Sequence, residues 1–168
     1  QTAEKNFGIF SLYLAFFPKL TMGPIERASD LIHQLKEKHI FRYESVTNGL
    51  KLMLWGFFQK IVIADRIAIY VDPIFENAYD FSGTRLLVAS VFFSFQLYAD
   101  FSGYTNIAIG AAKVLGINLT NNFDSPFFSK TISEFWRRWH ITLSSWVYTY
   151  LYNPIVVNRR DWGMFGII

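Results

Sequence analysis

Long apolar stretches alternate with short polar ones along this chain, and the alternation predicts helices. Four windows contain no charged residue, namely residues 6–18, 86–99, 101–112 and 141–158. Asp100 alone separates the second from the third, so the combined stretch is long enough to cross a bilayer, which takes about 20 mainly apolar residues. Residues 46–64 form a further apolar segment. Lys51 and Lys60 lie near its two ends, where long side chains can reach the membrane interfaces.

Polar segments separate these windows. Residues 26–44 hold eight charged residues and two histidines, interrupted by apolar positions at helical spacing. This pattern predicts a helix at the membrane surface that starts near Ser29 and Asp30, two residue types that accept hydrogen bonds from first-turn amides. Residues 72–85 and 118–130 are rich in proline, asparagine and aspartate, and we expect loops there.

Pro18 and Pro24 bracket a short segment that contains Gly23, so no continuous helix can pass through it. A plain turn and a re-entrant segment lining a cavity both fit this pattern. The order of segments predicts an all-α fold, a polytopic helical membrane protein fragment with re-entrant or surface helices. The chain starts without methionine and stops within an apolar run, so we expect residues 1–168 to be the interior part of one larger domain, truncated at both ends.

Composition supports the membrane interpretation over a soluble, aromatic-rich domain. Apolar residues make up 52% of the chain and aromatic residues 19%. Charged residues make up only 17%, against about 25% in ordinary soluble domains. The absence of cysteine excludes thiol chemistry and cysteine metal sites. A net charge of +3 is too small to indicate a nucleic-acid partner, and no cluster of metal-ligating residues is visible.

The strongest local signal begins at Thr131. Thr131 and Glu134 have the spacing of a capping box, which predicts the start of a helix. Continued helical spacing places His140 on an aromatic face with Trp136 and Trp139. A poorly hydrated imidazole there favours its neutral form. His140 is then either a general base or oxyanion donor, or an inert member of an interfacial aromatic belt.

Two neighbouring arginines, Arg137 and Arg138, precede this histidine. Adjacent arginines at the edge of an apolar segment indicate a cytoplasmic interface or a phospholipid contact. One of them could instead hold the phosphate of an anionic acyl donor. The basic residues of segment 26–44 favour the same cytoplasmic placement.

Asp100 is the one ionisable group in an otherwise uncharged stretch and is therefore a candidate functional residue. The alternative is structural, in which Asp100 caps a helix or pairs with an arginine such as Arg138. Gly103 and its small polar neighbours predict either a helix break or a close-packing point.

Three motifs, taken together, resemble the membrane-bound O-acyltransferase family, and in particular its bacterial branch of alginate O-acetyltransferase and teichoic acid D-alanyl transfer proteins. They are Phe-Phe-Pro-Lys-Leu-Thr-Met-Gly-Pro-Ile-Glu-Arg at residues 16–27, Tyr-Ala-Asp-Phe-Ser-Gly-Tyr-Thr-Asn at residues 98–106 and Phe-Trp-Arg-Arg-Trp-His-Ile-Thr-Leu-Ser at residues 135–144. They occur in the family's order across nearly the whole chain.

The resemblance implies a multi-pass helical protein of the bacterial cytoplasmic membrane, in contact with membrane lipid. It implies transfer of an acyl group, most simply acetyl, from a thioester donor to hydroxyls of an exported cell-surface polysaccharide. The donor, acetyl-CoA or an acyl carrier protein, is a co-substrate on the cytoplasmic side, and no bound cofactor or metal is implied. A separate periplasmic acyltransferase partner and the polysaccharide acceptor are the expected partners, with no nucleic acid.

Residue by residue, His140 matches the histidine of the family's Trp-x-x-Trp-His motif and is the candidate catalytic residue. The family's other histidine is expected downstream of residue 168. Supporting or substrate-tunnel residues implied by the motifs are Glu26, Arg27, Asp100, Ser102, Tyr104, Trp136, Arg137, Arg138, Trp139 and Ser144. The alternative function is a transporter or assembly scaffold without enzymatic activity, in which Asp100 and His140 make structural polar contacts.

Overall fold

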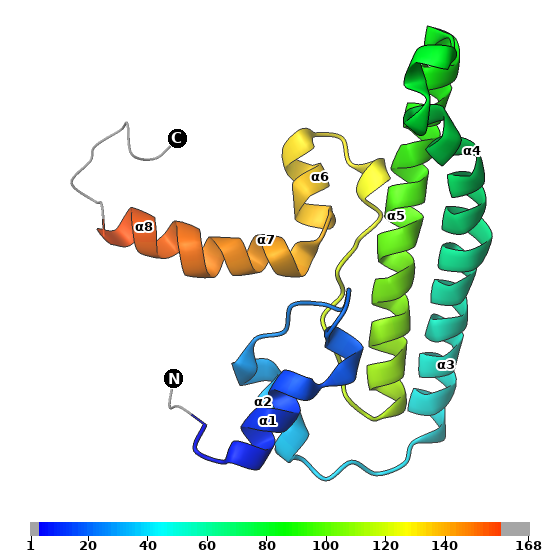
Figure 1. The fold of residues 1–168 in the computed structure, drawn as a ribbon. Coiled ribbons are helices and arrows are strands. Elements are labelled where there is room, and N and C mark those ends of the chain that lie inside the picture. The colour runs from blue at the N-terminus through cyan, green and yellow to red at the C-terminus, as the bar shows by residue number, and fades with distance from the viewer. Residues whose placement is uncertain (1–3, 159–168) are drawn as a thin grey trace. The chain divides into compact units, whose positions relative to one another are not determined.

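The computed structural model describes residues 4–158, which fold into helices joined by loops, with no strand in this part of the chain (Figure 1). The predicted all-α class is confirmed. The described residues form two compact units: residues 4–23 with 27–119, and residues 24–26 with 120–158. The single larger domain expected from the sequence stays a prediction.

The helices of the two units differ in length. The first unit contains α1 (Phe7–Ala15), the 3₁₀ turn η1 (Phe17–Lys19), α2 (Ala28–Lys36), α3 (Tyr43–Phe57), the π-helical segment η2 (Phe58–Ala64), α4 (Asp65–Glu76), the 3₁₀ turn η3 (Ala78–Asp80) and α5 (Gly83–Val114). The second contains the 3₁₀ turn η4 (Pro126–Phe128), α6 (Ile132–Arg138), α7 (Ile141–Val147), the π-helical segment η5 (Tyr148–Tyr152) and α8 (Asn153–Asn158).

Helix α5 confirms the long apolar helix predicted over residues 86–112. Its 32 residues correspond to about 48 Å of helix. Among the described residues it is the one helix long and apolar enough to cross a membrane. It runs without interruption through Gly103, so the helix break considered for that position does not occur.

Helix α3, segment η2 and helix α4 form one continuous helix beside α5 (Figure 1). Glycines allow the close approach. A Cβ added to Gly56 would lie 2.6 Å from the carbonyl oxygen of Gly103, and one added to Gly49 would lie 2.7 Å from that of Gly110. Residue numbers rise along α3 as they fall along α5, so the two helices are antiparallel. The close-packing interpretation of Gly103 is confirmed.

Lys60 therefore lies inside a helix and not near its end. Its place at a membrane interface stays a prediction. The predicted loop over residues 72–85 is also too long. Helix α4 continues through Pro73 to Glu76, and α5 already begins at Gly83. Val71 and Ile74 are buried, and this packing retains a helical turn that proline would otherwise weaken.

The helix predicted over residues 26–44 is shorter than expected. Helix α2 follows Arg27 as its N-cap residue, without a cap from Ser29 or Asp30, and ends at Lys36. A linker over residues 37–42 leads to α3. Apolar side chains of α2, α5 and the segments beside them form the core of this unit, namely Phe16, Leu31, Ile109, Ala112, Ile117 and Leu119. The bend between the two prolines is confirmed, with η1 beginning beside Pro18.

In the second unit the continuous helix expected beyond Thr131 is wrong. Helix α6 ends at Arg138, and α7 starts at Ile141. Between them His140 adopts a left-handed backbone conformation with φ 45°, so it is not part of one aromatic helix face. The polar loop predicted over residues 118–130 is confirmed, with only the short turn η4 inside it.

Candidate functional site

The break between α6 and α7 is held by hydrogen bonds to a distant loop segment. The amide of Ile141 donates to the carbonyl of Asn122 at 2.9 Å, and the amide of Asp124 donates to the carbonyl of Arg138 at 3.0 Å. These two bonds clamp residues 122–124 against the chain on both sides of His140. We call this arrangement the Asn122 clamp.

The Asn122 side chain completes the clamp. Its Oδ1 accepts from the amide of Thr142 at 3.3 Å and from the Thr142 hydroxyl at 2.9 Å, while Thr142 Oγ1 accepts from the amide of Ile25 at 3.0 Å. Asn122 and Thr142 are both buried. Buried polar groups with several hydrogen-bond partners stabilise a single backbone conformation. The clamp therefore explains why α6 does not continue past Arg138.

Glu26 belongs to the same unit and is also buried. Its carboxylate accepts from the amide of Thr120 and, at 3.3 Å, from the Thr120 hydroxyl. The first motif predicted two site residues, Glu26 and Arg27. Glu26 connects residues 24–26 to the loop that leads to Asn122. Arg27 precedes α2 as its N-cap residue.

His140 itself is partly buried, and burial lowers the pKa of its imidazole. A lowered pKa keeps the ring neutral near pH 7, with one nitrogen able to accept a proton or hydrogen bond and the other able to donate. A left-handed conformation costs a residue other than glycine roughly 1–2 kcal/mol. The Asn122 clamp supplies the bonds that hold His140 in this conformation.

Helix α6 has a capped start. Thr131 Oγ1 accepts from the amide of Glu134 at 3.1 Å, as the capping box predicts. Glu134, however, accepts from the amide of Lys130, one residue before the predicted donor. This bond and the nearby arginines lower the pKa of the Glu134 carboxyl. Glu134 also pairs with Arg138 at 2.7 Å, and Arg137 donates to the Ser133 hydroxyl at 3.2 Å.

The two tryptophans of the motif lie in different surroundings. The Trp139 ring stacks on Phe135 with centroids 5.6 Å apart and meets the edge of Phe123 at 5.1 Å. Trp136 is exposed, and its carbonyl accepts from the Ser144 hydroxyl at 3.4 Å. Trp139 therefore anchors the break by packing, whereas Trp136 presents its ring at the surface of this unit.

A second polar group lies on α5. Asp100 Oδ1 is 2.7 Å from Lys60 Nζ, and the same nitrogen is 2.6 Å from Asp65 Oδ1. Lys60 and Asp65 are five residues apart, a spacing that an α-helix places on different sides. The π-helical segment η2 brings them together, because its hydrogen bonds span five residues. The partner of Asp100 is thus Lys60, and not the arginine considered from the sequence.

Further polar contacts surround this ion pair. Gln59 Nε2 donates to the Ser102 hydroxyl at 3.2 Å and Gln59 Oε1 accepts from Asn106 at 2.7 Å. Tyr104 has its ring centroid 5.6 Å from Lys60 Nζ. All three α5 residues named in the second motif, Asp100, Ser102 and Tyr104, therefore lie around η2. A pocket of about 360 Å³ opens beside them, lined by Lys60, Asp65, Asp72, Gln96 and Asp100 among others.

Sequence reasoning missed the residues that hold each group in place. Lys60 was expected at the end of an apolar segment, although it is the charge opposite Asp100, and Gln59 belongs to none of the predicted motifs. Asn122 and Thr142 looked like ordinary loop and helix residues. Within residues 4–158, no three His, Asp or Glu side chains come together as a metal site would require.

Comparison with known proteins gives a consistent result. The model of the MBOAT, membrane-bound O-acyltransferase family matches residues 6–161. The peptidoglycan O-acetyltransferase of Helicobacter pylori is 42% identical over 92% of this chain and 30% of its own length. The probable alginate O-acetylase of Pseudomonas putida is 37% identical over 94% of this chain and 32% of its own. The teichoic acid D-alanyltransferase of Bacillus subtilis is 29% identical over 89% of this chain and 39% of its own. The chain thus spans about a third of the length of these curated relatives.

Proposed function

We propose that this chain, which belongs to the membrane-bound O-acyltransferase family, is part of an enzyme that acylates an exported cell-surface polysaccharide. Members of this family are membrane-bound, as the name states. The observation that carries the proposal is identity of 42% and 37% to two O-acetyl transfer proteins across more than nine tenths of the chain. The transferred group in this proposal is acetyl.

The reaction joins a thioester donor to a hydroxyl acceptor. The acceptor oxygen attacks the thioester carbonyl carbon, the carbon–sulfur bond breaks, and the hydroxyl proton passes through a base to the departing thiolate, which leaves as a thiol. Such a reaction needs a base near the hydroxyl and a hydrogen-bond donor for the negative charge that develops on the carbonyl oxygen.

We assign His140 to the acceptor side of this reaction. Its lowered pKa keeps the imidazole neutral, so one nitrogen can accept a bond from the acceptor hydroxyl while the other donates. His140, in its left-handed backbone conformation, lies in the break between the end of α6 and the start of α7. In this assignment Asn122 and Thr142 position the histidine. His140 orients the hydroxyl or stabilises charge, and a second histidine beyond residue 168 removes the proton.

The proposal extends to the donor, the partners and the membrane. Acetyl-CoA or an acetylated carrier protein approaches from the cytoplasmic side, where Arg137 can meet its phosphate. A separate periplasmic acyltransferase completes the transfer to the polysaccharide. The protein resides in the bacterial cytoplasmic membrane, with α5 as one of its crossings.

Replacement of His140 tests the proposal in the full-length protein. His140→Ala should lower polysaccharide O-acetylation by at least about 100-fold, since the loss of one hydrogen-bond donor that stabilises developing charge costs about 10²–10³-fold. Acetyl groups released from the purified polysaccharide by mild base are the measurement, with membrane abundance of the protein checked by immunoblot.

The matched control is His33→Ala, because His33 is exposed on α2 and pairs there with Glu37. This variant should acetylate at the wild-type level. Unchanged acetylation in His140→Ala at equal membrane abundance would contradict the assignment and favour a scaffold in which His140 is structural.

A further inference from the structure

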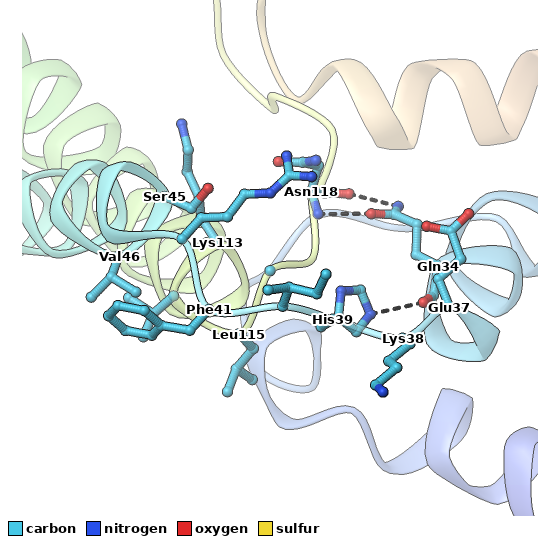
Figure 2. Close-up of a pocket in the computed structure, with 14 residues that line it drawn as sticks. Gln34, Glu37, Lys38, His39, Phe41, Ser45, Val46, Lys113, Leu115 and Asn118 are labelled. Carbon is cyan, nitrogen blue, oxygen red and sulfur yellow. Dashed lines mark hydrogen bonds between the residues drawn. The ribbon is translucent and has the colours of Figure 1, made fainter.

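A polar pocket lies where α5 ends and α3 begins. It has a volume of about 410 Å³ and is built from the end of α2, the linker over residues 37–42, the first turn of α3 and the chain just after α5 (Figure 2). All its lining residues belong to the first unit. We call it the linker pocket.

Hydrogen bonds hold its walls together. The Gln34 side chain accepts from the amide of Asn118 at 2.8 Å and donates to the Asn118 carbonyl at 2.9 Å, which ties the chain after α5 to α2 (Figure 2). His39 Nε2 lies 2.9 Å from the carbonyl of Gln34. Gly116 has φ 82°, and a Cβ added there would lie 3.0 Å from His39 Nδ1. Hydrogen bonds between its walls therefore fix the shape of the linker pocket.

The charges that line the linker pocket are mainly positive. Lys38, Arg42 and Lys113 contribute three cations. None of the three forms an ion pair within the part of the chain that the structure describes. Glu37 is the one acidic side chain in the lining, and its carboxylate is 3.1 Å from His33 Nδ1. An anion in the pocket would thus meet cations that have no acidic partner among residues 4–158.

Apolar side chains accompany these cations. Ile40 and Phe41 in the linker are 74% and 78% exposed, and Leu115 just beyond α5 is 47% exposed. All three line the same pocket as the cations. Cations and exposed apolar groups together at the end of a candidate membrane-crossing helix are typical of the headgroup and acyl-chain boundary.

We propose that the linker pocket binds the phosphate of an anionic glycerophospholipid, with Arg42 and Lys113 as its main cationic contacts. Arg42 lies at the start of α3 and Lys113 in the last turn of α5, so the lipid phosphate bridges the ends of the two helices. Ile40, Phe41 and Leu115 face the upper acyl chains. This inference concerns the membrane-facing end of the helix pair and does not depend on the proposed reaction.

The test uses the full-length protein in a neutral detergent with short-chain lipid analogues. Binding of dioctanoyl phosphatidylglycerol and of dioctanoyl phosphatidylcholine is measured by microscale thermophoresis. Wild type should prefer phosphatidylglycerol. The double variant Arg42→Gln, Lys113→Gln should bind it about 25-fold more weakly, because each cation near an anionic lipid surface contributes about fivefold.

The control is the double variant Lys5→Gln, Lys51→Gln, which removes the same charge from exposed positions outside the pocket. It should bind phosphatidylglycerol like wild type. Equal loss in both double variants, or equal affinity of wild type for the two lipids, would overturn the proposal. Displacement of phosphatidylglycerol by an equimolar amount of inorganic phosphate would also overturn it, because the ligand would then be a soluble anion.

Discussion

The α3–α5 helix pair and the Asn122 clamp hold polar groups in opposite ways. In the pair, two long helices pack through glycine contacts and place Asp100 against Lys60 by regular geometry, modified only by η2. In the clamp, two short helices are interrupted, and His140 is placed by hydrogen bonds from a loop. Packing along the whole length of α3 and α5 holds the helix pair together, whereas a few hydrogen bonds hold the Asn122 clamp together.

This difference indicates where each region is vulnerable. A change in the helix pair should affect stability first, because the contacts there connect whole helices. A change in the clamp should affect the position of His140 first, because its hydrogen bonds hold the chain on both sides of this residue. Measuring stability and acetylation together in the full-length protein separates the two regions.

The largest expected loss of stability comes from breaking the ion pair. Lys60→Met leaves Asp100 without its cation, and we expect a loss of about 3 kcal/mol in the free energy of unfolding, the lower end of the range for broken buried pairs. The lower end applies because the two side chains are 26% and 30% exposed. Thermal unfolding of the detergent-solubilised protein measures the loss.

Lys51→Met is the matched control, since Lys51 is an exposed lysine on the same helix without an acidic partner in the described chain. The double variant Lys60→Met, Asp100→Leu should recover much of the lost stability, because no buried charge then remains uncompensated. A double variant less stable than Lys60→Met would refute the pairing.

A smaller loss is expected from the glycine contacts. Gly56→Ala adds a Cβ 2.6 Å from the carbonyl oxygen of Gly103, so the helices must separate locally. We expect a loss of about 1–3 kcal/mol, as for other overpacked sites. In Gly83→Ala the added Cβ has no neighbour within 4 Å, so stability should not fall. If both variants unfold at the wild-type temperature, the close approach of the two helices is wrong.

A change in the clamp should lower acetylation more than it lowers stability. Asn122→Ala removes both bonds to Thr142, which contribute about 0.5–1.5 kcal/mol each. Stability should fall by about 1–3 kcal/mol, while acetylation falls by at least about tenfold because the histidine is no longer held in place. Asn121→Ala, at the exposed neighbouring position, is the control for both measurements. Full acetylation in Asn122→Ala would show that His140 does not need the clamp.

The smallest effect concerns pH. Burial lowers the pKa of His140, so below the unfolded value of about 6.5 the unfolded chain binds more protons than the folded one. Stability should therefore rise with pH up to about 6.5 and fall on acidification, by less than about 1 kcal/mol for this partly exposed ring. Unfolding temperatures of wild type and His140→Gln across this range measure the effect. If the unfolding temperatures of wild type and His140→Gln change with pH in the same way, the pH dependence does not come from His140.

The sequence predicts the helix pair far better than the clamp. An apolar run interrupted by the single charge of Asp100 predicts α5 nearly to its ends, and the small residues around Gly103 already suggest a packing point. Helical periodicity fails at His140 because the competing bonds come from Asn122, and Asn122 and Thr142 are separated by 20 residues in the sequence. Periodicity describes one segment at a time, so it cannot detect such a partner.

The same limit applies to the ion pair. Asp100 stands out in the sequence as a lone charge, whereas Lys60 reads as a lysine at a helix end because charged residues follow it. Only the continuation of the helix through η2 and α4 moves Lys60 to the middle of a helix and opposite Asp100.

The π-helical segment η2 acts as a one-residue phase shift within a long helix. The amide of Asp65 donates to the carbonyl of Lys60, so the turn holds one residue more than an α-helical turn. Deleting one residue, such as the exposed Val62, would restore α-helical hydrogen bonding, and the acid at Asp65 would then follow Lys60 by four positions, a spacing that an α-helix places on one face. A relative with a shorter helix at this point can keep the ion pair only if its acid follows the lysine by four positions. Alignments of this family should therefore allow a single-residue gap inside an unbroken helix.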